Sequence, residues 1–449
     1  MVKYVEVPLK SVSDRLDVGY YLVLSEVRDR YDVDKGTPLT GLGARIRTRT
    51  PPREVYSEEG TPCIKLRNVT GQFLNATNCD FVPARLQAKF VTAKKYDIII
   101  TATGEGTAGR CDIFLEDQPY IVTGENILFR PRLDRINPFY LLSVLRSKPV
   151  RNQLTQLVRG ATGQTHLYWN DIASIRVPLA DRPSQKECER LYLEAWKRRQ
   201  QAAAHIQTAK AAITGAVRAE KVDLKARDLV FEIHSTQTKS PLRFDVEYYQ
   251  PIHERTLEKL RRAGAVQVQT LADLNEKTVN PRTRPTSRFH YIDISSVDIE
   301  LGDYVPTTVL GHEAPTRARR KPRKGDVIVS TVRPARNAVA LITDEPSNLL
   351  VSTGFCVLSP VKVKTLVLFA MLKTEIVFSQ IARKATAAMY PAVTEKDVLD
   401  TWVPSLPASM SDEVERQVGA SASLRRQADR LLAEFEALGE KAFELLLVR

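Results

Sequence analysis

The chain has 449 residues, of which 43% are hydrophobic and 27% charged, and Lys and Arg outnumber Asp and Glu by 66 to 53. This composition is typical of a globular protein with two to four domains, and it excludes a chain too polar to bury a core. The formal net charge of +13 favours a polyanionic partner, first of all nucleic acid, over a basic surface that binds nothing.

Cysteine usage and apolar runs indicate the compartment. The five cysteines are odd in number and scattered, with no Cys-x-x-Cys pair, which argues against a disulfide framework and for a reducing environment. The opening residues carry charges where a secretory signal needs an apolar core. The longest apolar run, residues 365–372, is too short to span a bilayer. We therefore expect a cytoplasmic protein with no membrane partner.

An internal repeat organises the chain. Four short segments recur in the same order at offsets of 226 to 229 residues: RLDVGYY (15–21) as RFDVEYY (243–249), KYDIII (95–100) as KGDVIV (324–329), DI (171–172) as DV (397–398), and ECER (187–190) as EVER (413–416). Collinear matches at a nearly constant offset indicate a tandem duplication of about half the chain.

Each half has the same predicted elements in the same order. A region with Pro, Gly and short Val/Ile/Thr runs predicts β-strands broken by turns. A helical segment follows, from Asn137-Pro138 in the first half and from about residue 366 in the second, and a polar stretch then leads to a Val-Pro pair. The predicted organisation is a β-rich domain over 1–183, a long helix over 184–226, a second β-rich domain over 227–408 and a second long helix over 409–449.

The two long helices have the clearest periodicity. Apolar residues such as Ala195, Ala202 and Ile206 in the first, and Val414 and Val418 in the second, recur mostly at steps of 3, 4 and 7, opposite a charged face. One apolar seam on each helix favours antiparallel packing of the pair over two separate protein-binding helices. The predicted fold class is α+β: a tandem duplication of a β-rich domain plus a long helix, with the helices forming an antiparallel coiled coil.

The stretch TATGEGTAG (101–109) has the Gly-x-Gly-x-x-Gly spacing of a dinucleotide-binding loop behind an apolar strand. Such a loop needs a helix directly after it, to hold phosphate at the helix N-terminus. Here an alternating, strand-like stretch follows, and the second copy has STVRPAR (330–336), without glycine, at the same place. We therefore predict a turn between two strands and no cofactor.

Other chemical motifs are weak. Asn137-Pro-Phe-Tyr140 is one residue from the tetrad of amino-methyltransferases, but it precedes a helical pattern and is better explained as an N-cap followed by a first-turn proline. Residues 36–43 lack the Lys-Ser/Thr of a P-loop. The six histidines lie far apart, without metal-ligand spacing. We predict no catalytic residue and no metal site.

The positive charge is organised in both β-rich regions. Arg45, Arg47 and Arg49 alternate, so they share one face if the segment is extended. The second copy has a dense basic run over residues 317–324 and two arginines, Arg333 and Arg336, in the turn equivalent to the glycine-rich stretch. A single basic run is often only a solvated face. Because such runs occur in both copies of a basic chain, they favour nucleic-acid contact.

In this arrangement the chain resembles the specificity (S) subunit of type I restriction–modification systems. The resemblance covers nearly the whole length. It depends on the Arg-x-Asp-x-x-Tyr-Tyr start of each half, the Lys-x-Asp-Ile/Val-Ile strand with its Gly-rich or Arg-rich turn, the Asp-Ile/Val and Val-Pro close, and the long helix after each half. The second copy departs from this pattern in lacking the Gly-rich turn.

The resemblance implies that each β-rich region is a target recognition domain that reads one half of a bipartite site in double-stranded DNA. The helices would set the spacing of the half-sites and dock DNA methyltransferase (M) subunits, expected to be two, with restriction (R) subunits as possible further partners. The chain itself would be non-catalytic and without cofactor, because S-adenosylmethionine, ATP and Mg belong to the partner subunits.

The residues expected to contact DNA combine basic and polar side chains from both halves. In the first half they are Arg45, Arg47, Arg49, Lys65, Arg67, Asn68, Arg110, Thr162 and Gln164; in the second they are Arg282, Arg284, Arg317, Arg319, Arg333, Arg336 and Tyr390. Two alternatives stay open at this point. One is a divergent DNA adenine methyltransferase, and the other is a non-specific DNA-binding scaffold of another phage-defence complex.

Overall fold

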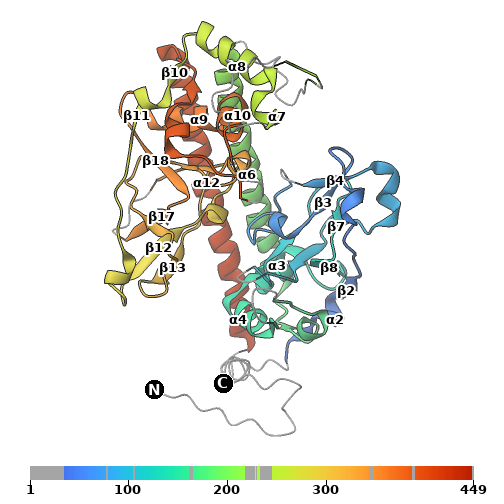
Figure 1. Cartoon of the computed structure of the whole chain (residues 1–449). Helices are drawn as coiled ribbons and strands as arrows, with labels where there is room; N and C mark the ends of the chain where they lie inside the picture. The colour runs from blue at the N-terminus through green and yellow to red at the C-terminus, as the bar shows by residue number, and fades with distance from the viewer. Residues whose placement is uncertain are drawn as a thin grey trace. The chain divides into compact units, whose positions relative to one another are not determined.

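The computed structural model describes residues 35–76, 79–104, 107–160, 165–217, 228, 230–232, 245–343, 348–386 and 390–446 (Figure 1). The chain divides into two compact units, one formed by residues 1–198 and 426–449 and the other by residues 199–425. Both cuts fall inside the long helices α6 (Arg182–Ala216) and α12 (Ala408–Ala442). Each helix therefore contributes one part to each unit.

The first unit contains three sheets. The largest is antiparallel, with the order β2 (Gly43–Ile46), β8 (Asn126–Pro131), β5 (Ile98–Thr101) and β6 (Cys111–Ile113). The others are β4 (Asp80–Val82), β3 (Thr61–Ile64) and β7 (Ile121–Val122), in which β3 and β7 are parallel, and the pair β1 (Thr37–Pro38) and β9 (Arg176–Val177). The shorter helices are α2 (Leu39–Leu42), η3 (Arg53–Val55), η4 (Leu66–Asn68), η5 (Ala84–Lys89), α3 (Pro138–Arg146), α4 (Lys148–Leu157) and α5 (Trp169–Ile172).

The second unit has the same plan. Its largest sheet has the order β11 (Ala272–Leu274), β18 (Phe355–Pro360), β15 (Val327–Ser330) and β16 (Val339–Leu341). The next is β13 (Thr307–Leu310), β12 (Arg288–Ile292), β17 (Leu349–Ser352) and β14 (Ala318–Arg320), and the smallest pairs β10 (Val266–Gln267) with β19 (Trp402–Val403). The shorter helices are α7 (Val246–Tyr249), α8 (Pro251–Arg262), η7 (Val268–Thr270), η8 (Pro281–Thr283), η9 (Ile294–Ser296), η10 (Pro334–Arg336), α9 (Thr365–Lys373), α10 (Glu375–Ala382), α11 (Glu395–Leu399) and η11 (Phe443–Leu446), the last of which follows α12 in the first unit.

The predicted duplication is confirmed by the order of strands in the largest sheets and by the order of the helices. The order β2-β8-β5-β6 repeats as β11-β18-β15-β16, and the parallel pair β3–β7 repeats as β12–β17. The helices α3, α4, α5 and α6 repeat in order as α9, α10, α11 and α12. The two halves therefore share one α+β scaffold.

The aspartate of the repeated Lys-x-Asp motif shapes the same turn in both halves. Asp97 is buried and accepts a hydrogen bond from the backbone N–H of Lys94 at 2.8 Å, as Asp326 does from Arg323 at 2.8 Å. The remaining hydrogen-bond partners of the two carboxylates differ. Arg130 donates two hydrogen bonds to Asp97, whereas the side chains of Asn275 and Ser359 each donate one to Asp326. The motif is thus explained by turn formation before the central strand.

The Asn137-Pro138 pair is an N-cap, as predicted. The Asn137 side chain accepts hydrogen bonds from the backbone N–H groups of Phe139 and Tyr140, at 2.9 and 3.3 Å, and Pro138 occupies the first turn of α3. The Asn137 amide also donates to Glu189 of α6 at 2.6 Å. Helix capping thus accounts for the Asn-Pro pair that resembles the methyltransferase tetrad.

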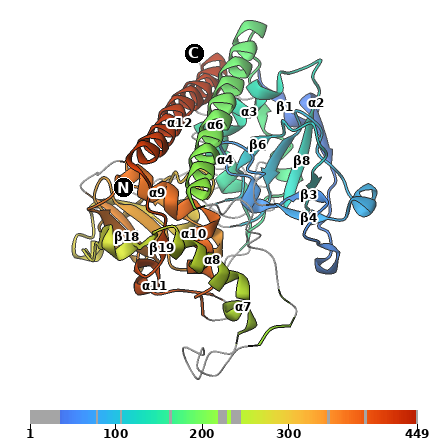
Figure 2. The ribbon, with the colours of Figure 1, turned by 90° about the horizontal axis from the view of Figure 1, so that it is seen from above.

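The long helices pack through small and apolar residues in each unit. In the first unit Tyr192 and Ala195 of α6 share a core with Ala428 and Phe435 of α12, and the Tyr192 and Phe435 rings lie 5.2 Å apart. Figures 1 and 2 show the two helices side by side.

In the second unit Ala202, Ile206 and Ala209 of α6 share a core with Val414 and Val418 of α12. Residue numbers rise along one helix as they fall along the other, so the packing is antiparallel, as predicted.

A buried cation ends the equivalent helices α3 and α9. Arg146 donates to Asp112 at 2.5 Å and to the carbonyl oxygens of Gln72 and Cys111 at 2.8 and 3.0 Å. Lys373, 227 residues later, donates to the carbonyl oxygen of Ile299 at 2.7 Å. Each cation therefore ties the segment after η4 or η9 to the helices of its own unit.

No single helix in the described ranges is long and apolar enough to cross a membrane; α9 and α10, bent by 66° at their junction, meet that test only as a pair.

Phe435→Ala tests the dependence of the first unit on the last helix. Phe435 is fully buried against Tyr192, so its removal is expected to lower the free energy of unfolding by about 3–5 kcal/mol. Denaturant unfolding measures the change. Ala437→Ser, an exposed position on the same helix, is the control and should change little. Equal stability of the wild type and Phe435→Ala would contradict this packing.

Lys373 makes the stability of the second unit depend on pH. Burial is the main cause that lowers the pKa of Lys373 to about 7, assisted by Lys210 and Arg425 and opposed by Asp298 and Glu300. Between pH 7 and the usual value near 10.5 the unfolded chain binds more protons, so the free energy of unfolding rises with pH in this window.

Lys373→Met removes this titration. Relative to the variant, the wild type is expected to gain up to about 2 kcal/mol of stability between pH 7 and 9. Denaturant unfolding of both proteins at several pH values measures the difference. Parallel stability curves for the two proteins over this range would show that Lys373 does not titrate there.

Candidate nucleic-acid interface

The glycine-rich stretch is a turn between strands β5 and β6, as predicted. Gly104 and Gly109 have φ values of 97° and 88°, in the region that side chains disfavour. The equivalent residues of the second half, Arg333 and Asn337, have φ values of 50° and 51°. The turn therefore needs left-handed backbone at two positions, and this requirement explains Gly104 and Gly109 without a cofactor, whereas Gly106 lies outside the described residues.

Each turn is joined to a later loop of its own half. In the first half the backbone N–H of Leu167 donates to the carbonyl oxygen of Ala102 at 2.7 Å. In the second half the backbone N–H of Val393 donates to the carbonyl oxygen of Thr331 at 2.8 Å, and the backbone N–H of Arg333 donates to the carbonyl oxygen of Pro391 at 2.6 Å. The loop that holds Tyr390 thus lies against the Arg333 turn. The expected contacts Thr162 and Gln164 lie outside the described residues.

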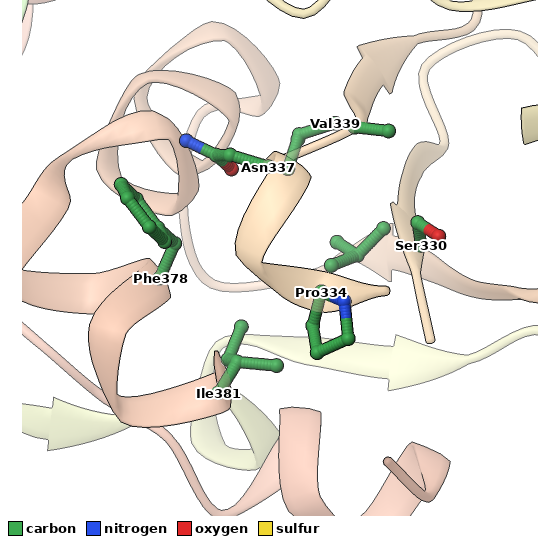
Figure 3. Close-up of a pocket in the computed structure, with 8 residues that line it drawn as sticks. Ser330, Pro334, Asn337, Val339, Phe378 and Ile381 are labelled. Carbon is green, nitrogen blue, oxygen red and sulfur yellow. The ribbon is translucent and has the colours of Figure 1, made fainter. Parts of the chain in front are cut away.

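A small pocket lies under the turn of the second half (Figure 3). Pro334 and Asn337 of the turn face Phe378 and Ile381 of α10, and Ser330 and Val339 complete the wall. The cavity volume is about 10 Å³, which is enough for about one water molecule. This pocket is therefore too small for a nucleotide or S-adenosylmethionine.

The arginines of the first half lie at the surface. Arg45, at the edge strand β2, is exposed, as are Arg47 and Arg49 beyond it. Arg49 donates to the carbonyl oxygen of Lys89 at 2.7 Å and stacks on the Phe90 ring at 5.1 Å. Arg110, after the turn, is also exposed. All four side chains thus reach solvent.

Lys65 and Arg67 are held by one acidic residue. Asp80 accepts from Lys65 at 2.5 Å and from Arg67 at 2.6 Å, and the Lys65 ammonium also lies 3.9 Å from the centre of the Tyr56 ring. Burial alone lowers the pKa of Lys65, but hydrogen bonds with Asp80 and Tyr56 outweigh it and raise the pKa. Burial likewise opposes ionisation of Asp80, but the two cations dominate and lower its pKa. Lys65 and Asp80 are therefore charged at neutral pH.

Asn68 corrects the list of expected DNA contacts. Its side chain is only 1% exposed. The side-chain Oδ1 of Asn68 accepts a hydrogen bond from the backbone N–H of Lys65 at 2.8 Å. The side-chain Nδ2 of Asn68 donates to the backbone carbonyl oxygen of Asn75 at 2.8 Å. These bonds complete the short helix η4, so the expectation of a DNA contact is replaced by a structural role for Asn68.

The basic residues of the second half are exposed to different degrees. Arg282 and Arg284, at η8, are exposed, and Arg284 lies 5.7 Å from the Phe289 ring centre. Arg317 is exposed, whereas Arg319 is half-buried and donates to the carbonyl oxygen of Thr316 at 3.2 Å. The basic run over 317–324 is therefore only partly available at the surface.

Arg333 and Tyr390 are brought together across the joined loops. The Arg333 guanidinium lies 5.1 Å from the centre of the Tyr390 ring, and Tyr390 is 63% exposed. Arg336, three residues later, is exposed as well. The turn that the first half fills with glycines thus carries a cation–aromatic pair in the second half.

Two cations were missed by the sequence reasoning. Arg85 and Lys89 are exposed on η5, next to Arg49 through the bond to the Lys89 carbonyl oxygen. Their four-residue spacing after Pro83 is the signal that could have identified them. The cationic surface of the first half therefore includes η5.

Nucleophile and metal chemistry find no support in the described residues. No group of three or more His, Cys, Asp or Glu side chains there could hold a metal ion. Burial raises the pKa of Cys63 to about 11 and those of Cys79 and Cys111 to about 12. These groups are therefore neutral thiols at neutral pH, and a thiolate is the nucleophilic form.

No known family model matches the chain, and no curated protein is a significant sequence match. Three solved structures are similar to it. One is the S subunit of a type I restriction–modification system from M. genitalium, at 12% identity over 92% of this chain and 96% of that chain, with a TM-score of 0.37. Another comes from a structure on complex assembly and conformational transition of the type I R-M system. It has 16% identity over 91% of this chain and 96% of that chain, with a TM-score of 0.30. The third is the HsdS subunit from Thermoanaerobacter tengcongensis, at 15% identity over 92% of this chain and 95% of that chain, with a TM-score of 0.29.

Proposed function

We propose that this chain is the sequence-recognition subunit of a type I restriction–modification complex and that each half reads one part of a bipartite DNA site. The observation that carries the proposal is the duplicated turn-and-loop site. The backbone is the same in both halves, with left-handed residues at equivalent positions, while the side chains on it differ. A repeated scaffold with different exposed side chains is what two readers of different half-sites require.

The charge distribution supports DNA as the ligand. Exposed arginines gather at the edge strand β2 in the first half and at η8 and the β15–β16 turn in the second. In a chain of net charge +13 these side chains supply phosphate contacts, and hence affinity that falls with salt. Arginine on a guanine edge supplies sequence choice.

Catalysis is assigned to partner subunits in this proposal. Methyltransferase subunits, expected to be two from the resemblance to S subunits, would bind S-adenosylmethionine, and restriction subunits would use ATP and Mg. The chain itself would position these subunits on DNA and perform no chemical step.

The two-reader proposal is tested by selecting duplexes from a random library with the full-length chain. We expect the wild type to enrich two short sequences at a fixed spacing. The double variant Arg45→Ala/Arg47→Ala should relax only one of them, and Arg282→Ala/Arg284→Ala only the other, because the altered arginines lie in different halves. Sequencing of the bound duplexes measures this. Loss of both sequences in either variant would contradict the two-reader proposal.

The alternative functions give different results in binding assays. A divergent methyltransferase would bind S-adenosylmethionine as the isolated chain, which calorimetry would detect; we expect no binding. A non-specific scaffold would bind selected and random duplexes equally across a salt titration, whereas we expect at least about a 1,000-fold preference for the selected site.

Asp80→Asn tests whether Asp80 restrains two DNA-binding cations. Loss of the carboxylate charge weakens its hold on Lys65 and Arg67, so affinity for a random duplex should rise several-fold at low salt and less at high salt. Fluorescence anisotropy measures the affinity. Asp117→Asn is the matched control, because Asp117 is exposed and pairs only with Lys95 among the described residues. An equal rise in both variants would indicate a general charge effect.

A further inference from the structure

The structure contains three residues other than glycine with positive φ in its described part, namely Tyr96, Arg333 and Asn337. Each has a glycine of positive φ at the equivalent position of the other half: Gly325, Gly104 and Gly109, respectively. The scaffold therefore demands left-handed backbone at these three places. A side chain at any of them is strained unless something else compensates.

Two of the three side chains have a structural explanation. Tyr96 packs edge-on against the buried Phe139 ring at 5.8 Å. Asn337 belongs to a residue type that tolerates left-handed backbone, and its amide donates to the carbonyl oxygen of Lys373 at 3.2 Å. In both cases the side chain contributes to the fold of its own unit.

Arg333 lacks such a contribution. Within the described part of the chain its guanidinium makes no hydrogen bond and no ion pair. Its cation–aromatic contact there is with the ring of Tyr390, which is itself exposed. Arginine is not among the residue types enriched in left-handed backbone, which costs it some strain, and glycine serves the same turn in the first half. Strain that the fold does not need is typical of functional sites.

We propose that Arg333, placed against the Tyr390 ring, reads a guanine in the half-site of the second half; this inference depends on the proposed function. Arg333 is half-buried, and its contact with the Tyr390 ring orients the guanidinium without occupying its N–H donors, so little freedom is lost when it binds. On DNA, that edge matches the O6 and N7 acceptors of guanine in the major groove. A phosphate contact needs only charge, which an unstrained Lys or Arg elsewhere on this surface could supply.

The test uses the turn of the first half as a template. Arg333→Gly gives the second half the residue found at Gly104. Relief of backbone strain should raise the melting temperature by about 2 °C. Duplex selection should return the wild-type site with one G·C position relaxed, and the preference for that base pair should fall by about 10-fold or more. Arg333→Lys keeps the charge but not the planar fork, so it should lose the same preference.

Asn337→Gly is the matched control, because it changes the second left-handed position of the same turn and leaves Arg333 in place. It should keep the full preference for guanine. If Arg333→Gly or Arg333→Lys selects the same site as the wild type, the inference is wrong. If the wild type selects no sequence at all, the proposed function itself is wrong. The two failures are thus distinguished by the wild-type result alone.

Discussion

The packing of α6 against α12 is the interaction on which both compact units depend. Ala195, Ala202 and Ala209 lie at seven-residue intervals on α6 and are fully buried. Small residues at this spacing let a second helix approach closely along the same seam. The larger partner residues, such as Phe435 in the first unit and Val418 in the second, come from α12. Since each helix passes through both units, neither half of the chain completes its core without residues from the other half.

This dependence separates what the duplication preserves from what it varies. The preserved features are internal: the turn aspartates Asp97 and Asp326, the cations Arg146 and Lys373 that tie a β-rich segment to helices, and the left-handed turn positions. Even these vary in chemistry when the geometry allows it, as the exchange of Arg146 for Lys373 shows. At the surface the side chains can differ, as the glycines of one turn and the Arg333–Tyr390 pair of the other show.

The sequence predicted the parts of the fold that depend on local pattern. The long helices, the repeat and the strand-to-strand turn were all confirmed. Helix periodicity and turn chemistry depend on residues close together in the sequence, and the repeat is found by comparing the sequence with itself. The site was harder to predict. Asn68 is buried, and Lys65 and Arg67 are paired with Asp80, through contacts that form only after the strands pair. Arg85 and Lys89 were missed because no dense basic run marks them.

Lys65 and Arg67 in the first half and Arg333 in the second are held in physically different ways, and this difference bears on how each would bind DNA. Lys65 and Arg67 are ion-paired, so a DNA phosphate must compete with Asp80 for their hydrogen bonds. Arg333 rests on an aromatic ring, which orients it without occupying its N–H donors. An ion-paired cation gains little net energy on binding, since one charged partner replaces another. A stacked cation exchanges only water for its ligand, so its binding energy depends on whether the new acceptors fit its fork. Stacking therefore favours discrimination between bases, and ion pairing favours suppression of non-specific binding.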